Sequence, residues 1–300
     1  MENNTSMLEF HILSFFMDVD IKLFIFNMVV FFLIYFFGIL LNLIVITVIC
    51  LDPYLHTPMY LFLCSLSIID MCYLTVIVPK LLYILLSGNN TISFSQCFIQ
   101  IYFYFLSGTT EVIVICVMAY DRYVAICYPL YYHCILNKKI CTILIMVIWI
   151  SGFLNSSLFT SSILKMVFCF SFTIHQFFCD VKALINISCG NEMFYMLMYA
   201  NCLLLGLLPS MFNLMSYVKI IRIILRIKSK DGRSKAFFTC SSHLTVMVIY
   251  YGSAVLVYMM PPSDRYNVLE QILTVFYTTV VPMLNPLIYS LRNKELKNSL

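Results

Sequence analysis

Long apolar runs, each bounded by charged residues, repeat along the chain. A helix needs about 20 apolar residues to cross the hydrocarbon core of a bilayer, and each run is at least that long. Few charges lie inside the runs. The pattern predicts seven membrane-spanning helices, at residues 23–51, 57–86, 96–127, 140–164, 193–218, 236–260 and 271–291.

The composition agrees with this pattern. Hydrophobic residues make up 62% of the 300 residues and charged residues only 11%, whereas a soluble domain carries about a quarter charged residues. We therefore predict an all-α integral membrane protein, a bundle of seven transmembrane helices in contact with membrane lipid. The net charge of +4 is too small to suggest a nucleic-acid partner.

The 18 lysines and arginines are distributed unequally between the two sides of the predicted bundle. If the N-terminus lies outside, most of them fall on the cytoplasmic side, as the positive-inside rule requires. We expect an extracellular N-terminus (1–22), a transmembrane domain (23–291) and a short cytoplasmic tail (292–300). The exceptions lie outside or at the outer boundary: Lys22, Lys80, Lys165, Lys182 and Arg265.

The N-terminal segment carries two Asn-x-Ser/Thr sequons, at Asn3 and Asn4, and on the outer side both are expected to be glycosylated. Glu2 and Glu9 replace the basic flank of a signal peptide, so we expect none and assign insertion to the first span. Most of the 13 cysteines lie inside apolar runs, where cysteine behaves as a small buried hydrophobe.

Several motifs occur in a fixed order along the chain. Residues 118–127 read MAYDRYVAIC, residues 235–244 read KAFFTCSSHL, and residues 282–293 read PMLNPLIYSLRN. With PMYLFL at 58–63 and LSIID at 66–70, they resemble the signatures of the odorant-receptor family of rhodopsin-like (class A) G-protein-coupled receptors. The resemblance covers nearly the whole chain. Two positions depart from it: Leu41 stands before Asn42 where glycine is usual, and Phe238 stands where serine is usual.

The resemblance implies a receptor and not an enzyme. Such a receptor binds a small odorant and activates a stimulatory heterotrimeric G protein, which raises cyclic AMP in the ciliary membrane of olfactory neurons. It assigns coupling to Asp121, Arg122, Tyr123, Tyr217 and Lys235. For Arg122 the residues alone also allow an interfacial arginine that reaches lipid phosphates.

Two carboxylates, Asp70 and Glu111, fall about halfway along their predicted helices. A carboxylate at that depth costs roughly 2.5–3.5 kcal/mol and usually faces the bundle interior. The resemblance places both near Asn285. We expect a polar cluster that could hold a sodium ion or share a proton, because two close carboxylates do not both ionise cheaply; the alternative is a helix contact without an ion. No other metal or cofactor is expected.

The resemblance also implies a disulfide between Cys97, at the outer end of the third span, and Cys179, in the long loop after the fourth. Cys169 and Cys189 lie in the same loop and face the oxidising side. We predict a second bridge between them, although spacing alone does not fix connectivity.

In similar receptors the ligand lies between the outer halves of the third, fifth, sixth and seventh helices. The matching positions are aromatic and aliphatic with a few hydroxyls, and they suit a small, mostly apolar molecule rather than an amine. About half are expected to touch ligand, because such stripes often reflect packing. They are Tyr104, Phe105, Gly108, Thr109, Val112, Cys202, Gly206, Tyr251, Val255, Tyr258, Met259 and Thr279.

Two other functions have to be considered. A receptor for an endogenous lipid or peptide would use the same mechanism, although the short N-terminus and neutral pocket disfavour a large charged peptide. A transporter or membrane enzyme would need repeats, broken helices or a reactive cluster, and the sequence contains no such signal. Cyclic-AMP output against an odorant panel separates the three.

Overall fold

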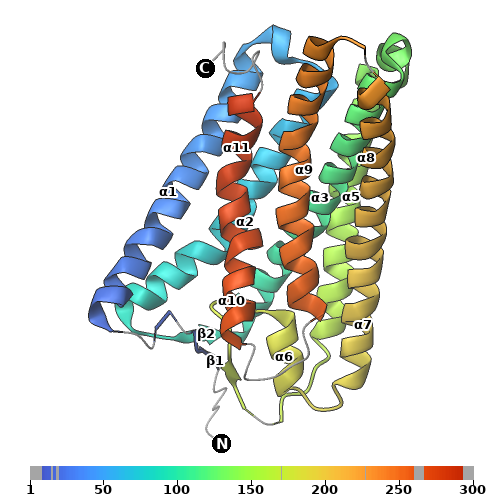
Figure 1. Cartoon of the computed structure of the whole chain (residues 1–300). Helices are drawn as coiled ribbons and strands as arrows, with labels where there is room; N and C mark the ends of the chain where they lie inside the picture. Colours follow the sequence, from blue (N-terminus) through green and yellow to red (C-terminus); the bar gives the residue numbers. More distant parts are fainter. Residues whose placement is uncertain are drawn as a thin grey trace, which may run out of the picture.

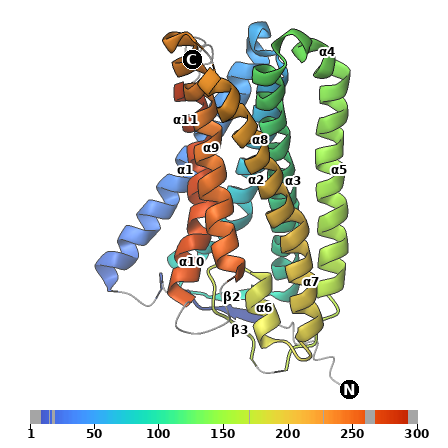
Figure 2. The same ribbon diagram turned by 45° about the vertical axis from the view of Figure 1, so that its right-hand side comes forward.

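The computed structural model describes residues 9–14, 16–17, 20–169, 171–226, 228–259 and 267–292. Long helices run side by side and form a bundle (Figures 1 and 2). At one end, the sheet end, lie three short strands and helix α6 (Val181–Ile187); at the other, the triplet end, lie Asp121–Tyr123. The predicted sequons at Asn3 and Asn4 and the tail beyond residue 292 lie outside the described residues.

The predicted bundle is confirmed. Six helical segments are long and apolar enough to cross a membrane, and the remaining one, α9, contributes a shorter apolar part at His243–Met259. The first four spans are α1 (Ile21–Leu51), α2 (Pro58–Ser87), α3 (Phe94–Cys127) and α5 (Lys138–Ile163). The short helices η1 (Pro53–Leu55), η2 (Pro129–Tyr131) and α4 (Tyr132–Ile135) connect them at the triplet end.

The fifth and seventh spans each contain a π-helical segment. The fifth consists of α7 (Glu192–Cys202), η3 (Leu203–Leu207) and α8 (Leu208–Arg226); the seventh of α10 (Asn267–Val275), η5 (Phe276–Val280) and α11 (Val281–Arg292). The sixth is α9 (Lys230–Met259). A π segment inserts an extra residue into a turn and rotates the side chains that follow, which the apolar pattern does not reveal.

Local signals explain several helix ends. The Ser93 hydroxyl oxygen accepts a hydrogen bond from the Gln96 backbone amide, and the Gln96 side-chain oxygen accepts one from the Ser93 backbone amide, forming a capping box for α3. Pro58 occupies the first turn of α2, and Gly88 ends that helix with φ of 68°, a conformation that favours glycine. α8 and α9 extend past the predicted spans into charged sequence, because long cationic side chains reach water from a helix end.

The all-α expectation missed a small sheet at the sheet end. Strand β1 (Glu9–Ile12) pairs antiparallel with β2 (Thr91–Ser93) and parallel with β3 (Thr173–Ile174). Phe10 and Ile12 are fully buried while their neighbours are exposed. The alternation covers only four residues, which is too short to predict a strand without knowledge of the partners that bury it.

Both predicted disulfides are present. Cys97 is joined to Cys179, and Cys169 to Cys189. The first bridge ties the loop after α5 to the start of α3, so that Phe177 and Phe178 lie buried in the core. The loop therefore covers the bundle at the sheet end.

The outer surface of the bundle is apolar. On α1, Phe26 is 61% exposed, Phe32 54% and Phe36 50%. Exposed apolar area on this scale is unfavourable in water but is the expected lipid-facing surface of a membrane helix. The buried residues concentrate on α2 and α3, and α3 contacts α2, α5, α8 and α9. The third span is thus the centre of the fold, and it carries much of the candidate site.

Candidate ligand-binding site

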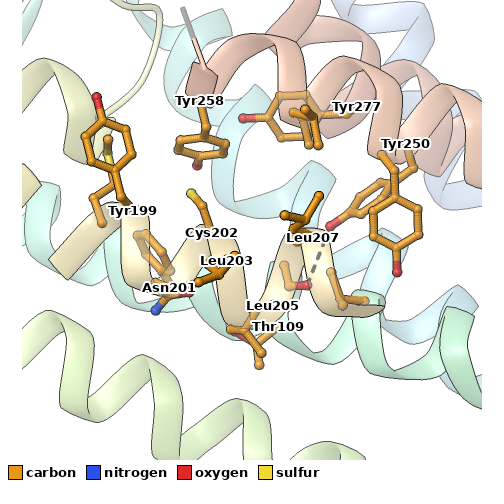
Figure 3. Close-up of a pocket in the computed structure, with 18 of the residues that line it drawn as sticks. Thr109, Tyr199, Asn201, Cys202, Leu203, Leu205, Leu207, Tyr250, Tyr258 and Tyr277 are labelled. Carbon is orange, nitrogen blue, oxygen red and sulfur yellow. Dashed lines mark hydrogen bonds between the residues drawn. The ribbon is translucent and has the colours of Figure 1, made fainter. Parts of the chain in front are cut away.

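A cavity of about 620 Å³ lies within the bundle toward the sheet end. Residues of α3, α7, η3 and α9 form most of its wall, and α2, α5 and η5 contribute one residue each. Its volume falls in the range of about 300–1,000 Å³ that is typical of small-molecule sites. In Figure 3, Tyr258 and Tyr277 face the stretch that carries Cys202 and Leu203 across the cavity.

The cavity brings together the positions expected to bind ligand, with one exception. Thr279 is buried off the wall, and its hydroxyl donates to the Val275 carbonyl oxygen at 2.7 Å. The π segment η5 instead places Tyr277 on the wall. The other expected positions are all lining residues: Tyr104, Phe105, Gly108, Thr109, Val112, Cys202, Gly206, Tyr251, Val255, Tyr258 and Met259.

Sequence reasoning missed about half of the wall. The fifth span contributes most of these residues, half of them from α7 and half from η3, whose π-helical turn is not marked by any period in the sequence. Tyr250 could have been found from its neighbour Tyr251, since both lie one turn from Ala254 and Val255 on α9. The missed residues are Tyr73, Phe159, Met198, Tyr199, Asn201, Leu203, Leu205, Leu207, Tyr250, Ala254 and Tyr277.

Three tyrosine hydroxyls meet at one side of the cavity. The Tyr104 hydroxyl lies 2.7 Å from that of Tyr277 and 3.1 Å from that of Tyr258. The three residues come from α3, η5 and α9. Phe178 of the covering loop packs on Tyr104, with ring centroids 5.1 Å apart. This cluster, the tyrosine triad, links three spans and the loop at a single point on the cavity wall.

A second polar element lies at Thr109. Asn155 on α5 donates to the Thr109 hydroxyl oxygen at 2.9 Å, and Asn201 on α7 donates to the Asn155 side-chain oxygen at 3.2 Å. The Thr109 hydroxyl accepts in this chain, so its own hydrogen remains a donor. No residue described as lining the cavity carries a formal charge at neutral pH. The wall therefore suits a neutral ligand with an oxygen or similar acceptor.

Two of the three polar residues expected at the centre of the bundle are joined by hydrogen bonds. The Asn285 amide donates to both carboxylate oxygens of Asp70 at 3.0 Å. Glu111 is fully buried and interacts electrostatically with Asp70. Its two carboxylate oxygens have no hydrogen-bond partner among the described residues. Buried carboxylates need a compensating charge or a proton, so Asp70, Glu111 and Asn285 fit a small cation with oxygen ligands.

At the triplet end, Arg122 and Asp121 form an ion pair at 3.5 Å. Tyr132 of α4 donates to the other oxygen of Asp121 at 2.7 Å. Tyr217 on α8 is buried and shares a 2.7 Å hydrogen bond with His243 on α9. These contacts join α3 to α4 and α8 to α9. The side chains of Lys235 and Phe238 lie outside the described part of the chain.

A buried charged group at the sheet end attaches the covering loop to the bundle. Lys182 is 2% exposed; its ammonium donates to Glu270 of α10 at 2.7 Å and to the Val257 carbonyl of α9 at 2.9 Å. Asp180 caps α6 by accepting from the amides of Lys182 and Ala183. Burial, and then the charge of Glu270, raises the pKa of Asp180 to about 6. The loop is thereby attached to both the sixth and seventh spans.

A bundle of membrane-spanning helices with an internal, uncharged cavity and a cross-linked covering loop defines a multi-pass membrane protein with a small-molecule site. Residues 31–300 match the family model described as olfactory receptor. The chain belongs to the olfactory receptor family.

Its curated relatives cover most or all of the chain. Human (Homo sapiens) olfactory receptor 8D1 is 46% identical over 260 residues, which span 86% of this chain and 84% of the relative. Human olfactory receptor 2L3 is 41% identical over 302 residues, spanning 100% and 96%. Dog (Canis lupus familiaris) olfactory receptor-like protein OLF4 is 39% identical over 301 residues, spanning 100% and 97%. The family makes this chain an odorant receptor rather than an enzyme.

Proposed function

We propose that this receptor binds a small, neutral, mostly apolar odorant in the cavity and activates a stimulatory heterotrimeric G protein. The uncharged wall with a few hydroxyl and amide groups is the observation that carries the ligand class. The sheet end faces the outside and the triplet end the cytoplasm, in keeping with the distribution of cationic residues. Coupling to the G protein, output as cyclic AMP and a location in the ciliary membrane follow from the family.

The tyrosine triad offers a route from ligand to G protein. A ligand that competes for the Tyr258 hydroxyl changes the contact between α9 and α3. The far part of α9 carries His243, which is hydrogen-bonded to Tyr217 near Arg122. A ligand shifts this equilibrium only through its better affinity for one arrangement of α9. The odorant is thus expected to favour the arrangement that frees Arg122 from Asp121 for the G protein.

The polar cluster belongs to the same proposal. Asp70, Glu111 and Asn285 would hold a sodium ion, which would supply the positive charge that the two buried carboxylates lack. The partnerless oxygens of Glu111 support this assignment. The ion would hold α2, α3 and α11 together at mid-depth, where helix rearrangement during activation would have to disturb it.

The test is cyclic-AMP output from cells that express the receptor, screened against an odorant panel, with Arg122→Ala as a matched control. The wild type should respond to a subset of neutral odorants, and Arg122→Ala should give no cyclic AMP while still binding the same odorant. A full response from Arg122→Ala would contradict the coupling role. The absence of any response, together with no association with a G protein, would contradict the receptor proposal itself.

A further inference from the structure

A second hollow lies at the triplet end, between α3 and α8. Its volume is about 260 Å³, and it is separate from the ligand cavity. Three cations and two tyrosines make up five of its seven lining residues. The residues of this cationic cleft are Tyr123, Cys127, Tyr128, Lys219, Arg222, Ile223 and Arg226.

The cations of the cleft share one face of α8. Lys219, Arg222 and Arg226 follow one another at intervals of three and four residues, which places them in one row along a helix. From α3, Tyr123 and Cys127 are four residues apart and form the opposing row. Cations that only anchored the helix in the interface would need no common row. Here they converge on a concave surface.

The cleft has no anionic side chain to balance this charge. Among the described residues, none of its cations forms an ion pair. The Lys219 ammonium instead lies 5.7 Å from the centroid of the Tyr123 ring. Asp121, two residues before Tyr123, is buried and already bonded to Arg122 and Tyr132. Three like charges around one hollow repel each other, so the site is complete only with an anion.

We propose that the cationic cleft binds a phosphate group carrying about two negative charges. Guanidinium groups present a planar fork that fits phosphate oxygens, and lysine adds a point charge. The hydroxyls of Tyr123 and Tyr128 are further donors at the rim. The cleft shares no lining residue with the ligand cavity, so the site does not depend on which odorant occupies that cavity.

The neighbouring surface of α8 identifies the source of the phosphate as a membrane lipid. Met211, Met215, Val218 and Arg222 form a single row at three- and four-residue intervals. The first three are 52%, 57% and 40% exposed and wholly apolar. A lipid whose headgroup contacts Arg222 can lay an acyl chain along this row. A free phosphate has no acyl chain and would gain no binding energy from this apolar row.

The binding test uses purified full-length receptor in nanodiscs of phosphatidylcholine, with and without a few per cent of a phosphoinositide phosphorylated on its ring. Bound lipid is counted by native mass spectrometry. Arg222→Gln/Arg226→Gln removes two cleft charges. Lys138→Gln/Lys139→Gln removes two exposed charges from α5 at the same end but outside the cleft. Each cleft cation would donate charge-assisted hydrogen bonds to the phosphate; at about 1 kcal/mol or more for each cation removed, the cleft variant should bind at least about thirtyfold more weakly. The control should change by less than about threefold.

Soluble inositol phosphate in a parallel arm separates the two sources of the anion. Weak competition by the soluble compound supports the lipid; competition as strong as that of the lipid would overturn that assignment in favour of a free phosphate. An equal loss in both double variants would reduce the effect to general surface charge. Unchanged lipid binding with lost G-protein activation would assign the cleft to the G protein. Equal thermal stability of both variants in pure phosphatidylcholine shows that they are folded.

Discussion

The buried ion pair between Lys182 and Glu270 should determine how firmly the covering loop is attached to the bundle. The ammonium and carboxylate are 2.7 Å apart, with side chains 2% and 15% exposed. At an effective dielectric constant of about 20, the attraction at that distance is about 6 kcal/mol. Much of it offsets desolvation of the two ions. The pair is therefore weakly stabilising as a whole but costly to break on one side.

Glu270→Gln removes the negative charge of this ion pair, which is the costly way to break it. The amide oxygen still accepts a hydrogen bond, but the ammonium of Lys182 remains buried without its opposite charge. Removing one partner of such a pair costs about 3–5 kcal/mol. We expect the lower end of this range, because Asp180 is still nearby to interact with Lys182. The melting temperature of the purified receptor at neutral pH should fall by several degrees.

Lys182→Met tests the explanation. It removes the buried charge and keeps most of the aliphatic side chain. Glu270, left without its partner, is exposed enough to be partly hydrated. Lys182→Met should therefore lower the free energy of unfolding by less than about 1.5 kcal/mol. The double variant should melt near Lys182→Met and above Glu270→Gln alone. If the two single effects simply add, or if Glu270→Gln is as stable as wild type, the ion pair is not what attaches the loop.

Three further predictions follow from other parts of the molecule. The pKa of Asp180 is raised to about 6, so the stability that this carboxyl contributes is fully present below its ordinary pKa near 4 and is lost as the pH rises through 6. Lowering the pH from 7 to 5 should therefore raise the melting temperature more in wild type than in Asp180→Asn. An equal rise in both would contradict this. Gly152→Ala drives a methyl into side chains of α3 and should cost about 1–3 kcal/mol, whereas Gly252→Ala meets no atom within 4 Å and should leave surface expression unchanged; similar expression of both would refute the packing argument. Sodium chloride should raise the melting temperature above that in choline chloride, and Asp70→Asn should abolish the difference; equal wild-type values in both salts would favour a shared proton.

Much of the fold could be predicted because membrane insertion leaves a direct mark on the sequence. Uncharged runs gave the helical bundle, and the third span was predicted to within two residues at its start. The strands were missed because β1 is stabilised only by partners about 80 and 160 residues away in sequence, which no local pattern encodes. The end of α8 lies beyond the predicted span and the start of α9 lies before it, because a helix continues past its apolar part where cations reach water.

The site was predictable only where helical periodicity is regular. On α3, positions such as Phe105, Thr109 and Val112 share a face and all line the cavity. Where π segments interrupt the period, prediction failed: Thr279 lies off the wall, and Tyr277 lies on it. The Asp70–Asn285 contact depends on helices distant in sequence, and the family resemblance rather than any spacing suggested it.

Occupation of the cavity by the odorant is the central proposal, and two adjacent residues of η3 test it most directly. Leu203 lines the cavity, whereas Leu204 is 60% exposed and does not line it. With one agonist known, cyclic-AMP dose–response curves are recorded for Leu203→Trp and Leu204→Trp at matched surface expression. The half-maximal concentration should rise about tenfold or more for Leu203→Trp, because added bulk excludes ligand from a fitted pocket, and stay near wild type for Leu204→Trp. Equal curves for the two variants would contradict binding in this cavity.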